Sequence, residues 1–98
     1  MYSKIVLCLS EKEDDLLAKQ IAMLKERHHA EVLRISASDA AGQIPHWGSE
    51  VLFISDHEDL LTQAKARGLS TNDPQSMKES YTKAMEMLKA LGLKGTPE

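Results

Sequence analysis

The chain has little of what several protein classes require. It contains a single cysteine, Cys8, so it cannot form an internal disulfide, and this fits a protein of a reducing compartment. No apolar run approaches the ~18 residues of a membrane-spanning helix, and the N-terminus lacks the basic, apolar and small-residue order of a signal peptide. We therefore expect a cytoplasmic protein with no membrane contact.

Aromatic residues and glycine motifs are also scarce. Aromatic side chains make up 4% of the chain, so the core must be built mainly from aliphatic residues and methionine. The five glycines form neither the G-x-G-x-x-G pattern of dinucleotide-binding folds nor the G-x-x-x-x-G-K-[ST] pattern of P-loops. Since both phosphate-binding signatures are missing, we predict no bound cofactor.

Positive charge is neither in excess nor clustered. The formal net charge is −3 at pH 7, and the 12 lysines and arginines are interleaved with acids along the whole chain. Proteins that bind duplexes need a basic patch or stripe, because their affinity comes largely from neutralised phosphates. The sequence therefore predicts no nucleic-acid partner.

The composition that is present belongs to an ordinary small globular protein. Hydrophobic residues make up 42% and charged residues 28% of the 98 residues. A chain of this length has room for one hydrophobic core. We expect a single domain over residues 1–92, followed by a frayed tail at 93–98.

Apolar runs of strand length alternate with amphipathic segments of helix length. We expect strands at residues 4–9, 31–36, 50–54 and, in a short polar stretch, 69–72. Helices are expected at 11–28, between Ser55 and Gly68, and from Pro74 to Gly92, with one helical turn ending near Gly42. This order predicts a small three-layer α/β domain of Rossmann-like or flavodoxin-like type, with four parallel strands in the order 2-1-3-4 and helices on both faces.

Two of the helix starts are predicted from capping patterns. Ser10 and Glu13, and again Ser55 and Glu58, have the S-x-x-E spacing of a capping box. In such a box the serine oxygen accepts from a free backbone N–H, while the glutamate bonds back to the serine N–H. For the short helical turn, Ser38-Asp39 is the expected cap.

The last helix has a start signal of another kind and an apolar stripe. Asp73-Pro74 combines a capping acid with a proline at the first helical position. Six residues then follow one face at helical spacing, and we expect this face to pack on the core. They are Met77, Tyr81, Ala84, Met85, Leu88 and Leu91.

Acids and hydroxyls follow each predicted strand, where sites gather in open parallel sheets. Glu11, Asp39 and Asp56 are oxygen ligands of the kind that Mg²⁺ prefers, and His57 has the pH range of a catalytic acid or base. These residue types are also what helix N-termini require, so helix capping alone is the preferred interpretation. A metal-dependent hydrolase or phosphoryl-transfer site at this rim is the alternative.

The position of Asp56 at the end of the third strand, with Glu11 after the first, resembles response-regulator receiver domains. A receiver domain also has an acid pair directly after the first strand and a lysine after a fifth strand. Neither feature occurs in the predicted layout of this chain. The resemblance therefore transfers no activity.

Cys8 stands near the end of the first strand, and here the chain is similar in length and layout to the IIB phosphocarrier domains of sugar phosphotransferase systems. That resemblance implies a phosphorylated cysteine followed by a loop of glycine and small hydroxyl residues. The loop S-E-K-E-D-D has no glycine and four acids, which repel an anion. A buried structural cysteine is the preferred interpretation, and a phosphocarrier on Cys8 the weaker alternative.

Two apolar residues are candidates for partner contacts. Trp47 lies in the loop I-P-H-W-G, where it either plugs the core or meets a partner, and Met87 lies on the flank of the last helix. Because the catalytic signatures are incomplete, we expect a non-catalytic regulatory or adaptor module. Its partner would be another protein or a second copy of the chain.

Overall fold

The two central strands of the sheet are buried along nearly their whole length. The computed structural model describes residues 2–90. In it, β1 (Lys4–Cys8) pairs in parallel with β3 (Val51–Ser55), both being the most apolar stretches of the chain. The edge strands β2 (Glu31–Arg34) and β4 (Ser70–Asn72) are only partly buried. The predicted parallel sheet with order β2-β1-β3-β4 is confirmed, including the short fourth strand.

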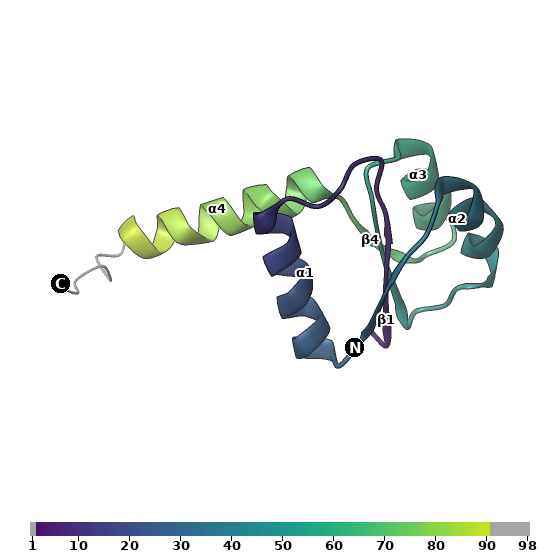
Figure 1. Ribbon diagram of the computed structural model, residues 1–98, viewed down its shortest axis with the longest axis horizontal. Helices are drawn as coiled ribbons and strands as arrows, with labels where there is room; N and C mark the ends of the chain where they lie inside the picture. Colours follow the sequence, from purple (N-terminus) through teal and green to yellow (C-terminus); the bar gives the residue numbers. More distant parts are fainter. Residues whose placement is uncertain (1, 91–98) are drawn as a thin grey trace.

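Helices cover both faces of this sheet, as Figure 1 shows. On one face lie α1 (Asp15–His28) and the beginning of α4 (Pro74–Ala90); on the other lie α2 (Ala37–Gln43), the 3₁₀ turn η1 (Ile44–His46) and α3 (Glu58–Ala66). Right-handed crossovers require this division, because the chain moves from β1 to β2 in one direction and from β2 through β3 to β4 in the other. No helix within residues 2–90 combines the length and the apolar character that crossing a bilayer requires.

The sheet divides the apolar core into two halves. Alternate residues of a strand point to opposite faces, so Ile5 and Leu7 pack towards α1, whereas Val6 and Cys8 pack towards α2 and α3. Phe53 is fully buried in the second half. A core made almost entirely of aliphatic side chains agrees with the low aromatic content.

Both predicted capping boxes are wrong. The helix α1 begins at Asp15, and its N-cap is Asp14, whose side chain accepts from Leu17 N at 2.8 Å. The N-cap of α3 is His57, while Ser55 is the last residue of β3. Ser10 instead donates to Asp56, while Ser55 donates to Cys8 O on the neighbouring strand and accepts from His57 N.

The other helix ends agree more closely with the sequence. Asp73 accepts from Ser76 N at 3.1 Å, which confirms the predicted start at Asp73-Pro74. Gly68, with φ of 80°, follows the end of α3 as predicted, in a conformation that favours glycine. The short helix α2 is capped by Ser36, which accepts from Asp39 N, rather than by the predicted Ser38-Asp39.

The expectation that one face of α4 packs on the core along its length is wrong. Met77 is buried and Tyr81 half-buried, but Met85 and Leu88 are 43% and 47% exposed. A five-residue strand spans about 16 Å, whereas a 17-residue helix is about 25 Å long, so α4 overruns the sheet. Figure 1 shows it crossing α1 and leaving the domain. The predicted end at Gly92, Leu91 and the tail at 93–98 lie outside the described residues.

Candidate functional site

The loops that follow β1 and β3 are joined by the carboxylate of Asp56. It accepts three hydrogen bonds from Ser10: from the backbone N–H at 3.0 and 3.2 Å and from the hydroxyl at 2.5 Å. In a sheet of this order, the crevice between β1 and β3 is the point at which a ligand would be expected. At that point the carboxylate is engaged by the neighbouring loop.

Ser55 makes a second link between the same strand ends. Its hydroxyl donates to Cys8 O at 2.7 Å and accepts from His57 N at 3.0 Å. The side chain is fully buried, so this bond replaces one that water would otherwise make. Two consecutive residues, Ser55 and Asp56, therefore secure the end of β1 and the loop beyond it.

The electrostatics of Asp56 follow from these bonds. Partial burial raises its pKa, but the hydrogen bonds from Ser10 and the nearby imidazole of His57 outweigh that effect, and the pKa of Asp56 is lowered overall. His57 Nε2 lies 3.6 Å from Asp56 Oδ1. The carboxylate is thus ionised at neutral pH and held in place by donors of the protein itself.

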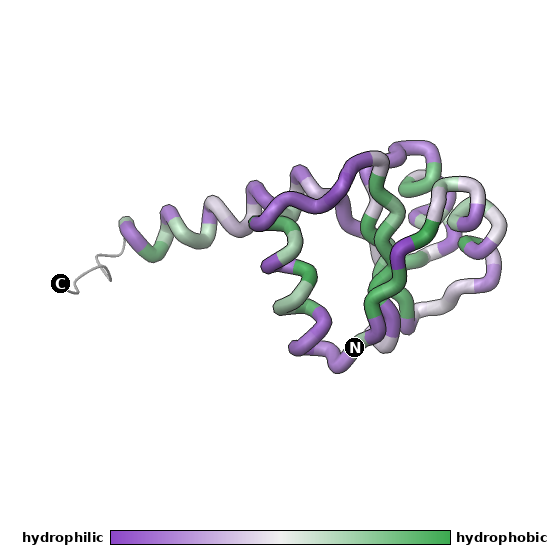
Figure 2. The backbone as a smooth tube through the Cα atoms, in the orientation of Figure 1, coloured by the Kyte–Doolittle hydropathy of each residue, from purple (hydrophilic) through white to green (hydrophobic). Residues whose placement is uncertain are grey.

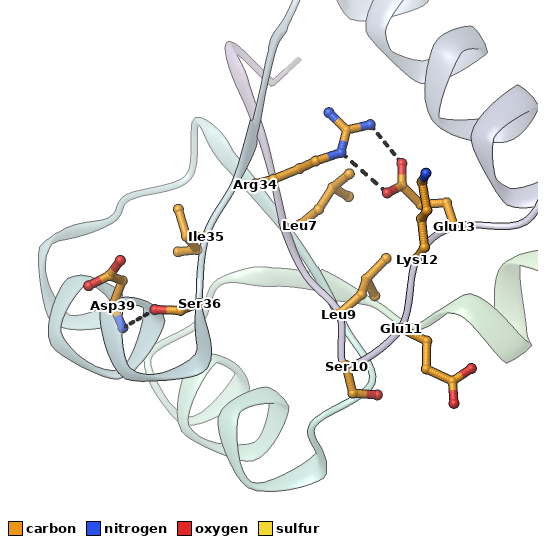
Figure 3. Close-up of a pocket in the computed structure, with 10 residues that line it drawn as sticks. All are labelled: Leu7, Leu9, Ser10, Glu11, Lys12, Glu13, Arg34, Ile35, Ser36 and Asp39. Carbon is orange, nitrogen blue, oxygen red and sulfur yellow. Dashed lines mark hydrogen bonds and ion pairs between the residues drawn. The ribbon is translucent and has the colours of Figure 1, made fainter.

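The other predicted metal ligands are not gathered around Asp56. Glu11 and Asp39 line a shallow pocket of about 460 Å³ above the ends of β1 and β2. Figure 3 shows them at opposite sides of that pocket, with their carboxylates turned away from each other. Residues 2–90 contain no group of three or more His, Cys, Asp or Glu side chains placed to hold a metal ion.

An ion pair crosses the same pocket. Arg34, at the end of β2, binds Glu13 with two hydrogen bonds, of 2.6 Å from Nη2 and 3.2 Å from Nε. The bonds from Arg34 lower the pKa of Glu13, and Glu13 raises that of Arg34. Glu13, which the predicted capping box placed at a helix start, instead anchors the loop after β1 to the edge strand.

Cys8 lies in the core rather than at a surface. It is 1% exposed and packs in the half of the core that contains Val6 and Phe53. Burial, together with the charges of Asp56 and Asp59, raises the pKa of the thiol despite its bond with Ser55. A protonated, inaccessible thiol is neither a nucleophile nor an acceptor for phosphate.

The two candidate partner residues have different surroundings. Trp47 is half-buried and packs on Phe53, with ring centroids 5.3 Å apart, so its ring closes one end of the core. Met87 is 62% exposed on α4. Of the two, only Met87 offers most of its surface to another molecule.

The exposed part of α4 has a distinctly apolar side, which we call the α4 apolar face. Figure 2 shows the projecting helix purple along its upper side and green or pale along its lower side. On a helix of 3.6 residues per turn, five residues share that side without an intervening charge. They are Tyr81, Ala84, Met85, Met87 and Leu88.

Several long-range pairs had no signal in the sequence. Ser10 and Asp56 are 46 residues apart, and Arg34 and Glu13 are 21 residues apart. Lys78 of α4 pairs with the α1 cap Asp14, which lowers the pKa of that carboxyl. Such partners become neighbours only through the order of the strands, so residue spacing alone cannot identify them.

Comparison of the chain with protein-family models, curated proteins and solved structures found no match.

Proposed function

We propose that this chain is a non-catalytic, cytoplasmic binding module with a Rossmann-like, flavodoxin-like layout, and that it contacts a protein partner through the α4 apolar face. The observation that supports this most directly is the exposure of Met85, Met87 and Leu88 on a helix that projects from the domain. Burying one such side chain fully is worth about 1.5–3 kcal/mol. The sheet leaves this apolar surface exposed, so a partner that covers the face gains the free energy of burying it.

The form of the surface suits recognition by helix packing. Anchors at i, i+3, i+4 and i+7 are the pattern with which an amphipathic helix occupies an apolar groove or pairs with another helix. Tyr81, Ala84, Met85 and Leu88 have this spacing. Methionine adds to the fit because its flexible side chain adapts to irregular contacts.

The sheet rim offers less support for the metal-dependent enzyme or for a phosphocarrier on Cys8. The Asp56 carboxylate is bonded to Ser10, and the Cys8 thiol is buried. A magnesium-dependent site on Glu11, Asp39 and Asp56 would shift the amide resonances of these residues during a Mg²⁺ titration. Shifts that saturate in the low-millimolar range would favour the enzyme over the binding module.

The binding proposal is tested by photo-crosslinking in cells. A photoreactive residue replaces Leu88 on the α4 apolar face or, as the matched control, Glu86 on the opposite side of the same helix turn. We expect a discrete protein adduct from position 88 and at least several-fold less from position 86. Equal adducts at both positions, or none at position 88, would contradict the proposal.

A further inference from the structure

We propose that the partner element that packs on the α4 apolar face is an amphipathic helix whose apolar stripe is bordered by acidic residues. The inference rests on the proposed function, because it names the chemistry of the partner at that same face. It is carried by the charges that border the face.

Both borders of the α4 apolar face are basic. Lys83 lies one turn before Met87 and Lys89 one turn after Met85, about 120° to either side of the centre of the face. Glu86, the only acid between them, lies on the opposite side of the helix. All three charged side chains are exposed. A helix that packs on this face therefore meets positive charge along each edge.

The groove between α1 and α4 extends this pattern onto the domain. It has a volume of about 200 Å³ and includes Met23, which is 54% exposed, and Tyr81, which stands one turn from Met85. Arg27 is the one charged residue in its lining. The apolar surface thus continues from α4 onto α1, and the charge beside it is again positive.

A second copy of the chain fits this surface poorly. In an antiparallel pair of α4 helices centred on Lys83, that lysine would face its own counterpart, and Lys89 would face Met77, with Lys78 beside it. In a parallel pair the opposite borders meet, which places Lys89 beside Lys83. Both of these registers set like charges together, which is destabilising, whereas acids on a partner would form pairs at the same places.

The expected size of the effect follows from exposed ion pairs. Each such pair changes affinity by roughly two- to threefold, so pairs at Arg27, Lys83 and Lys89 together give about tenfold. Salt should weaken this preference, because it screens charges at the surface.

The test uses two synthetic helical peptides with the same length and leucine stripe, one bordered by glutamate and one by lysine. Each carries a fluorophore and is titrated with the full chain, and anisotropy gives the dissociation constant. We expect the glutamate peptide to bind about tenfold more tightly and to shift the amides of Tyr81, Met85 and Leu88. The chain has a net charge of −3, so a non-specific charge effect would favour the lysine peptide instead.

Charge reversal on α4 provides the matched controls. The double variant K83E/K89E should invert the preference between the two peptides, whereas E86K, on the opposite side, should leave it unchanged. Circular dichroism confirms that each variant keeps its helix content.

The outcomes separate this inference from the binding proposal. Equal binding of both peptides, or tighter binding of the lysine peptide, would overturn the acidic partner while leaving the binding face in place. Concentration-dependent dimers that L88E abolishes would overturn it in favour of a second copy. Failure of both peptides to bind would also overturn the acidic helical partner. The crosslinks from position 88 would then test the binding proposal by themselves.

Discussion

Asp56 and Ser55 stabilise the ends of the central strands. Together they hold the backbone and side chain of Ser10 and the carbonyl of Cys8, and all of these groups belong to β1 or the loop that follows it. Side chains that resemble a catalytic set in sequence are thus engaged in joining two loops. This accounts for their residue types without a ligand.

Removing the Asp56 carboxylate should destabilise the fold. We expect D56A to lower the free energy of unfolding by about 1–2 kcal/mol, because hydrogen bonds to a charged acceptor are lost while the partly exposed site regains some water. Urea unfolding followed by circular dichroism measures the change. E86Q, on the exposed side of α4, is the control and should have little effect.

The loss in free energy of unfolding caused by D56A should also depend on pH. The pKa of Asp56 is lowered in the folded protein, so its contribution is fully present above the ordinary value of 3.8 and is lost as pH falls through the lower folded-state pKa. The stabilities of wild type and D56A should converge there. A difference that stays constant down to the acid transition would show that the carboxylate charge does not matter.

Cys8 should react only when the fold opens. Because the thiol is buried and its pKa is raised, labelling by a disulfide reagent at pH 8 should be roughly a hundredfold or more slower in the native protein than in denaturant. Absorbance of the released thiolate follows the reaction. Similar labelling rates in the native and the denatured protein would place the thiol at a surface and would support the phosphocarrier alternative.

For the helices and strands, the sequence predicted the positions of apolar faces correctly but did not predict which elements cover those faces. The spacing of Met77, Tyr81 and Leu88 correctly indicated one helix with one apolar side. It could not indicate that the strands beneath are too short to cover that side. The capping boxes at Ser10 and Ser55 failed for a related reason, since their competing partners, Asp56 and the Cys8 carbonyl, are distant in sequence.

The two halves of α4 should differ in local stability. Residues 74–81 pack on the domain, whereas 82–90 are exposed on all sides, and an isolated helical segment of that length is marginal in water. We expect amide hydrogen exchange in 82–90 to be at least about tenfold faster than in 74–81 or in the body of α1. Mass spectrometry of the free chain measures this, and uniform protection along α4 would contradict it.

The strand order could be predicted from the sequence, whereas the overall shape of the molecule could not. The alternation of strands and helices, with right-handed crossovers, leaves few arrangements for four strands, and the order β2-β1-β3-β4 is among them. The described part of the chain nevertheless measures 51 × 24 × 23 Å, because α4 extends beyond a small globular body. That extension depends on the relative lengths of helix and strand, which element order does not express.

Binding through α4, and not through the rim of the sheet, is the property on which the proposed function depends. It is tested most directly by hydrogen exchange over the whole chain, with and without the protein that position 88 crosslinks. We expect new protection in residues 82–90 and around Met23, and none at residues 10–13 or 55–57. Protection at the loops of Ser10 and Asp56, with α4 unchanged, would contradict it.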